Sequence, residues 1–140
     1  MEKGIILNLS GFYNHNGRSN KLNGSIYITP EGAFTGDVYD YRIGLKNPEQ
    51  EIKGHIIKEG NMTKLLFLKF PSGQNKTNLL YKLGSKITEY QPFSFVNNFE
   101  GRWQVLPYKI EYNKNYNLFM AKIDNSIMSV GDKAEINITA

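Results

Sequence analysis

Cysteine is absent from the 140-residue chain, which excludes disulfide bonds and thiol chemistry and suits a reducing compartment. Long apolar runs are absent as well. The run Ile5-Ile6-Leu7 near the start is too short for a signal-peptide core, and no later segment is long enough to span a bilayer. These absences predict a cytoplasmic protein with no membrane partner.

Arginine is scarce, with 3 residues against 14 lysines, and the formal net charge is +4. The basic residues are spread along the chain and form no run of the kind that follows a phosphate backbone, so we expect no nucleic-acid partner. Scattered lysines on outward strand positions are a common solubility device. The length fits one domain over residues 1–140.

Catalytic and metal-binding signatures are also missing. The two histidines, His15 and His55, have no second histidine or carboxylate at metal-ligand spacing, so we expect no metal and no cofactor. The sequence has no nucleophile-elbow pattern and no glycine-rich phosphate loop between a strand and a helix. Catalytic triads assemble in space rather than in sequence, so an enzyme stays open, but no catalytic residue is predicted.

Alternation of apolar and polar residues is the main signal that is present. Nearly every segment alternates with a period of two and ends at a Gly, Asn, Pro or Asp cluster, such as Asn16-Gly17 or Pro30-Glu31-Gly32. Short turns imply that consecutive strands are antiparallel neighbours. The pattern therefore predicts an all-β fold, a single antiparallel meander closed into a roughly eight-stranded up-and-down β-barrel. The eight or nine expected strands lie near residues 4–14, 21–29, 33–43, 50–59, 63–71, 77–83, 95–109, 116–124 and 133–139.

A glycine-centred pattern recurs four times in the order apolar, polar, Gly, polar, apolar. On a strand the first, third and fifth residues share one face, so each copy points a glycine inward between two apolar side chains. Glycines at such positions permit the sharp coiling that barrel closure needs. The four copies are Leu22–Ile26, Phe34–Val38, Ile52–Ile56 and Phe99–Trp103.

Extending this alternation predicts which side chains face the interior of the barrel, the lumen. Two of them, Asp40 and Asn97, are polar and must find partners, contact water or lie at an open mouth, unless a slip or bulge turns them outward. The predicted inward set is Leu22, Ile26, Ile28, Phe34, Val38, Asp40, Ile52, Ile56, Phe95, Asn97, Phe99, Trp103, Val105, Ala134, Ile136 and Ile138.

The segment Lys64–Phe70 departs from the alternation because both of its faces are apolar. A strand in a lone barrel should have one wet face, so the second face must be covered by another subunit, a loop or a terminal segment. We therefore expect a homo-oligomer formed through the strand around Leu66, Leu68 and Phe70.

Several segments resemble the avidin and streptavidin family of up-and-down β-barrels, within the wider calycin group. Gly11–Gly17 is similar to the opening strand of that family, in which an aromatic pair and an Asn precede a turn. Gly32–Gly36 is similar to its second hairpin, and Ile52–His55 and Phe99–Arg102 are similar to later strands. The resemblance implies a closed barrel and directs attention to the biotin site of the family.

Most of that biotin site is missing when it is carried over residue by residue. Asn14 matches the family's Asn for the ureido oxygen, but the Tyr of the next strand corresponds to Val38, which cannot donate a hydrogen bond. The Ser that follows corresponds to Asp40, and two pocket tryptophans are replaced by Phe70 and Phe99. An unpaired polar ligand atom costs about 1–3 kcal/mol. We therefore expect no biotin binding.

Three functions remain open. The main expectation is a non-catalytic module that binds a small, mostly apolar ligand in the lumen, with Trp103 as an aromatic wall. The second is a protein-interaction or assembly barrel whose lumen is filled by its own side chains. The third is an isomerase or cyclase that uses Asp40 or His15 as acid or base. The predicted ligand-binding residues are Asn14, Asp40, Phe70, Asn97, Phe99 and Trp103.

Overall fold

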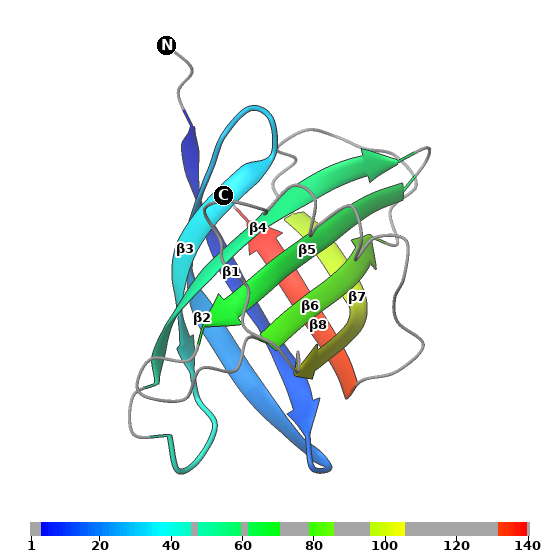
Figure 1. The fold of residues 1–140 in the computed structure, drawn as a ribbon. Coiled ribbons are helices and arrows are strands. Elements are labelled where there is room, and N and C mark those ends of the chain that lie inside the picture. Colours follow the sequence, from blue (N-terminus) through cyan, green and yellow to red (C-terminus); the bar gives the residue numbers. More distant parts are fainter. Residues whose placement is uncertain are drawn as a thin grey trace.

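The computed structural model describes residues 4–45, 48–59, 62–70, 79–85, 96–105 and 132–139. Its strands form one antiparallel meander that closes into a barrel when the last strand pairs with the first (Figure 1). The strands are β1 (Ile5–His15), β2 (Arg18–Ile28), β3 (Ala33–Asp40), β4 (Glu49–Glu59), β5 (Met62–Phe70), β6 (Leu79–Ser85), β7 (Val96–Val105) and β8 (Asp132–Thr139). The predicted fold class is thereby confirmed, and the strand expected near 116–124 lies outside the described residues. None of the described residues belongs to a helix capable of crossing a membrane.

The β1–β2 turn has the backbone geometry that its sequence predicts. Asn16 and Gly17 both have positive φ, 51° and 76°, as the two central residues of a tight type I′ hairpin require. The turn sets the register in which His15 pairs with Arg18. These two residues therefore lie side by side at one end of the barrel, which we call the mouth (Figure 1).

Inward-facing glycines let neighbouring strands approach closely, in agreement with the predicted role of the repeats. A Cβ added at Gly54 would lie 2.7 Å from the Cα of Phe67 on the next strand, and one at Gly24 would lie 2.8 Å from the Cα of Val38. Both separations are too short for a side chain. The strands can therefore coil tightly only because glycine is present there.

Side chains from several strands meet inside the barrel and form a buried aromatic and aliphatic cluster. Phe34 of β3 contacts Phe67 of β5, and Tyr13 of β1 contacts Tyr81 of β6, each with ring centroids 6.2 Å apart. Phe67 and Tyr81 also stack at 4.5 Å. The buried cluster consists of Leu9, Tyr13, Leu22, Ile26, Ile28, Phe34, Val38, Ile52, Leu65, Phe67, Tyr81, Leu83, Phe99, Trp103, Ala134, Ile136 and Ile138.

This cluster confirms most of the predicted inward set. Ile56 is only partly buried but packs against the cluster, and Asp40 is buried beside it. Phe95 and the side chains of Asn97 and Val105 lie outside the described part of the structure.

Both faces of β5 are buried, as its sequence suggests. Leu65 and Phe67 belong to the core cluster, whereas Leu66 and Leu68 occupy the alternate positions and are fully buried outside that cluster. Phe70, at the end of the strand, is half-buried. This burial exists within a single copy of the chain, so it does not require a second subunit, and the homo-oligomer remains a prediction.

Candidate functional site

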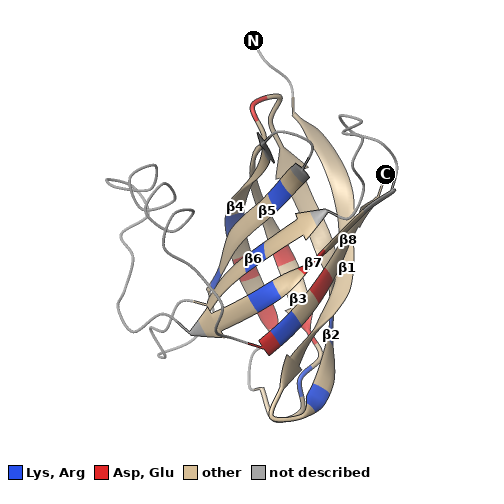
Figure 2. Cartoon of the chain, turned by 90° about the vertical axis from the view of Figure 1, so that its right-hand side faces the viewer, with Lys and Arg blue, Asp and Glu red and all other residues tan. Residues whose placement is uncertain are grey.

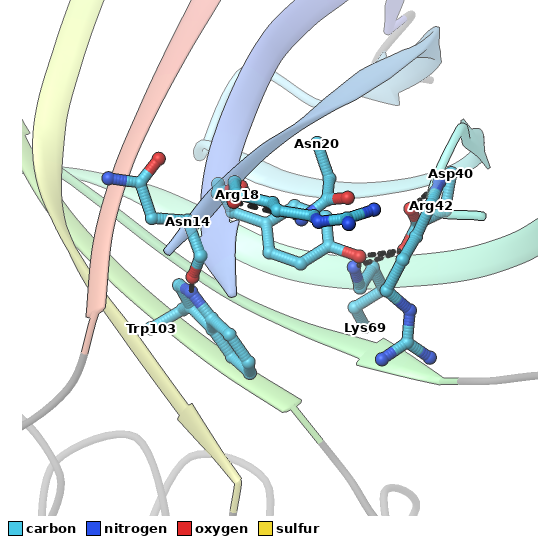
Figure 3. Close-up of polar contacts among 8 residues, drawn as sticks. Asn14, Arg18, Asn20, Asp40, Arg42, Lys69 and Trp103 are labelled. Atoms are coloured by element: carbon cyan, nitrogen blue, oxygen red, sulfur yellow. Dashed lines mark hydrogen bonds and ion pairs between the residues drawn. The ribbon is translucent and has the colours of Figure 1, made fainter. Parts of the chain in front are cut away.

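The meander brings the last residues of its odd-numbered strands together at the mouth. Tyr13 lies near the end of β1, Asp40 ends β3, Lys69 lies near the end of β5 and Trp103 near the end of β7. All four side chains are buried. Figure 3 labels Asp40, Lys69 and Trp103, which come from three separate strands. Antiparallel topology alone thus gathers residues that are far apart in the sequence.

Asp40 is the centre of a buried polar network with Tyr13 and Lys69. Its Oδ2 accepts hydrogen bonds from the Tyr13 hydroxyl at 2.6 Å and from Lys69 Nζ at 2.9 Å. Its Oδ1 accepts one from the backbone N–H of Arg42 at 2.9 Å. The side chains of Lys69 and Asp40 are 0% and 2% exposed. Both carboxylate oxygens are therefore engaged, which satisfies the inward aspartate that the sequence predicted.

Aromatic rings complete the surroundings of Lys69. Its Nζ lies 4.0 Å from the ring centroid of Tyr13 and 5.1 Å from that of Tyr81, distances at which the ring faces attract a cation. Burial lowers the pKa of Lys69 to about 8, although Asp40 acts in the opposite direction. Burial and the hydrogen bond to Asp40 raise the pKa of Tyr13. At neutral pH, below both pKa values, Lys69 is thus an ammonium and Tyr13 a neutral phenol.

Trp103 closes the barrel wall where strand pairing stops. The β1–β8 ladder ends at the pair Tyr13 and Ala134, so the carbonyl of Asn14 lies beyond the last paired residue. The Trp103 indole N–H donates to that carbonyl at 2.8 Å. Its ring also contacts Tyr13, with centroids 5.3 Å apart, and His15 at 5.6 Å. The single tryptophan therefore joins β7 to β1 and lies directly beside the mouth.

A pocket of about 390 Å³ lies at the mouth, between the β1–β2 turn and the segment that follows β3. We call it the mouth pocket. Asn20 links it to the network, since its Nδ2 donates to the backbone carbonyls of Tyr13 at 3.4 Å and Arg18 at 3.2 Å. Arg42 links it from the other side through its N–H bond to Asp40. The lining residues are His15, Asn16, Arg18, Asn20, Arg42, Ile43, Gly44 and Leu45.

The mouth pocket carries an excess of positive charge. Arg18 and Arg42 line it, and its described lining contains no aspartate or glutamate. Neither guanidinium forms an ion pair in the described part of the chain. The nearby carboxylate, Asp40, already pairs with Lys69. Burial is the main cause of the lowered pKa of Lys69, and the positive charge of Arg42 adds to it, which places Arg42 within electrostatic range of the network.

Three of the sequence-predicted ligand residues lie inside the barrel. Asp40 and Trp103 both contact Tyr13, through a hydrogen bond and a ring contact respectively. Phe99 is fully buried in the core cluster, on the same face of β7 as Trp103. The structure thus brings Asp40 and Trp103 together around Tyr13, a residue that was not among the predicted ligand contacts.

The other three predicted residues are placed differently. Asn14 alternates with the inward Tyr13, and in Figure 3 its amide points away from Trp103, so only its backbone carbonyl takes part. Phe70 alternates with the buried Lys69 and is only half-buried. Asn97 pairs with Ile138 in the β7–β8 register, and its side chain lies outside the described part.

Sequence reasoning missed Lys69, Arg18 and Arg42. Lys69 was hidden because both faces of its strand are apolar, so the period could not say which face was inward. One signal could have found it: an inward Asp40 needs a cationic partner on another strand, and Lys69 is flanked by apolar residues. The two arginines lie at a turn and after a strand, where alternation carries no information.

The histidines also separate in the structure. His55 alternates with the inward Gly54 on β4 and is half-buried, and burial lowers its pKa. His15 lines the mouth pocket. In the ranges that the structure describes, no group of three His, Cys, Asp or Glu residues is arranged to hold a metal ion.

No protein-family model, curated protein or solved structure matches this chain. The structure defines its class, a closed eight-stranded up-and-down β-barrel. The chemistry of the mouth pocket is therefore the basis on which a function can be assigned.

Proposed function

We propose that this barrel binds a small organic ligand in the mouth pocket rather than deep in the lumen. The observation that carries the proposal is the pocket itself: about 390 Å³, lined by apolar Ile43 and Leu45 together with several polar groups. Small-molecule sites commonly have about 300–1,000 Å³ and combine an apolar lining with a few placed polar groups.

The floor of the pocket supports a site at the mouth. Below it, Tyr13 contacts Tyr81 and Trp103 through its ring and Asp40 through its hydroxyl, and Lys69 lies over the Tyr13 ring. These contacts occupy the lumen at this level. A ligand that enters from the mouth therefore meets this buried, hydrogen-bonded network below the pocket.

The rim differs from the floor. Ile43 is 85% exposed, and Gly44 has a φ of 92°, a conformation that few other residues adopt. Floor residues such as Asn20 are buried and fixed by hydrogen bonds. A rigid floor with an exposed apolar rim is typical of binding sites that loops form on a barrel scaffold.

A relation to the avidin-like barrels forms part of this proposal. The closed up-and-down barrel and the inward glycines support it. Asn14, the residue that matches the ureido-binding Asn of that family, directs its side chain away from the lumen, and Val38 offers no donor. The proposed ligand is therefore not biotin.

Acid or base catalysis by Asp40 is less well supported. Both oxygens of its carboxylate accept hydrogen bonds, and its side chain is 2% exposed. A catalytic acid or base must reach the proton of the substrate. We therefore favour binding without catalysis.

Trp103 offers a direct test, because its ring contacts His15 in the pocket wall. We expect members of a panel of small amphipathic compounds to change its fluorescence. The double variant Ile43→Ala/Leu45→Ala should weaken their binding by roughly tenfold or more, since it removes apolar contact area. Ile6→Ala, an exposed isoleucine near the opposite end of β1, is the matched control and should have no effect. Silence across the panel, or equal binding to the double variant, would refute the proposal.

A further inference from the structure

We infer that the ligand of the mouth pocket is an organic anion, with an apolar body and one carboxylate or phosphate group held between Arg18 and Arg42. The inference rests on the proposed function and names the class of compound that the site takes.

Charge balance is the first argument. The mouth contains the cations of Arg18, Arg42 and Lys69, and Asp40 neutralises Lys69. Both guanidinium groups stay without an ion-pair partner in the described part of the chain. In Figure 2, basic residues (blue) mark the start of β2, next to the β1–β2 turn. A bound anion supplies the negative charge that the described residues around the two guanidinium groups do not.

The anchoring of the two arginines is the second argument. The backbone carbonyl of Arg18 accepts a hydrogen bond from Asn20, and the backbone N–H of Arg42 donates one to Asp40. The arginines thus start from fixed points on two different elements, the start of β2 and the segment after β3 (Figure 3). Both line the mouth pocket. A guanidinium donates two parallel hydrogen bonds to a carboxylate or phosphate.

The apolar side of the pocket defines the rest of the ligand. Ile43 and Leu45 line it beside Arg42, so a compound held by the arginines places its body against them. These apolar side chains can bury a hydrocarbon chain, which an inorganic ion does not have. An alkyl carboxylate or alkyl phosphate therefore matches both the charged and the apolar residues of the lining.

The test compares ligands that differ only in the head group. Octanoate, octyl phosphate and octanol are titrated at neutral pH into the full chain and into Arg18→Gln and Arg42→Gln, with calorimetry and Trp103 fluorescence as readouts. We expect an anion to bind the native protein roughly tenfold or more tightly than octanol, and each variant to lose most of that advantage. Added salt should weaken binding of the anions but not of octanol. The relative affinities of octanoate and octyl phosphate decide which group the site prefers.

Arg102→Gln is the matched control. It removes the same charge from an exposed arginine on β7 that does not line the pocket, so it should leave the affinity of the anions within about twofold of native. Thermal unfolding of all three variants verifies that they fold.

The outcomes separate the two proposals. If octanol binds as tightly as the anions and the arginine variants change neither, the mouth is a ligand site but the anion inference is wrong. If Arg102→Gln weakens anion binding as much as the other two variants do, the anions are held by the general positive charge of the protein. Specific binding between Arg18 and Arg42 would then be wrong. If no compound binds, both this inference and the proposed function fail.

Discussion

Lys69 and Asp40 form an ion pair at 2.9 Å inside a barrel of 140 residues, with their side chains 0% and 2% exposed. Both side chains are buried away from water, so each needs the other to compensate its charge. The hydroxyl of Tyr13 shares the same carboxylate oxygen. Asp40 is joined to the mouth pocket by the backbone N–H of Arg42, so the integrity of the pair affects both stability and the site.

Removing one member of the pair should be far more damaging than removing both. Asp40→Asn or Lys69→Met alone leaves an uncompensated buried group and should lower the free energy of unfolding by about 3–5 kcal/mol. The double variant Asp40→Asn/Lys69→Met should recover most of this loss. Urea unfolding of the four proteins measures the coupling. Additive losses would contradict a direct interaction between the two side chains.

Stability should rise with pH through the range in which Lys69 titrates. Its pKa is about 8 in the folded protein, below the ordinary value of 10.5, because burial disfavours the ammonium. Between these values the unfolded chain binds more protons than the folded one, so the free energy of unfolding increases as pH rises from about 8 towards 10. Above pH 10 Tyr13 and Tyr81 should lower the free energy of unfolding as pH rises. Their pKa values are raised in the folded protein, so only the unfolded chain loses those protons.

The variant Lys69→Met isolates this effect. Urea unfolding at intervals between pH 7 and 10 should show the rise in the native protein and a flatter profile in the variant. Parallel profiles would show that Lys69 does not cause the pH dependence.

Tyr13 and Tyr81 form a matched pair for testing the network. Both rings are buried, but only the Tyr13 hydroxyl has a partner among the described residues; the Tyr81 hydroxyl has none. Tyr13→Phe should therefore cost about 1.5–3 kcal/mol, the value of a hydrogen bond to a charged group. Tyr81→Phe should be neutral or slightly stabilising. Thermal unfolding compares the two variants. Equal losses of stability would show that the hydrogen bond from Tyr13 to Asp40 makes no net contribution.

The second face of β5 offers a test of assembly. Leu66 and Leu68 are fully buried within one copy of the chain, so we expect Leu68→Ala to lower the free energy of unfolding by about 2–5 kcal/mol. Ile6→Ala, at a position that is 73% exposed, should change it by less than about 0.5 kcal/mol.

Sedimentation of the native and variant proteins tests the predicted homo-oligomer. A native oligomer that the leucine variant dissociates without unfolding would show that this face joins subunits.

The sequence by itself determined the barrel. Its period of two specified strands, the Asn16-Gly17 turn specified a tight hairpin, and the glycine-centred repeats marked where strands coil, because each of these patterns is only a few residues long. The same period placed Asp40 inward, as the structure confirms. Local patterns of this kind can be recognised in a single sequence.

Only the tertiary structure decided what surrounds Asp40. Lys69 is 29 residues away from it, on a strand whose two apolar faces conceal its orientation. Arg18 begins β2 and Arg42 follows β3, and which of these segments meet at the mouth depends on how the sheet closes. The side-chain direction of Asn14 likewise depends on the register of the closed barrel, which turns Tyr13 inward instead. The site forms only when the barrel closes, and closure requires all eight strands together.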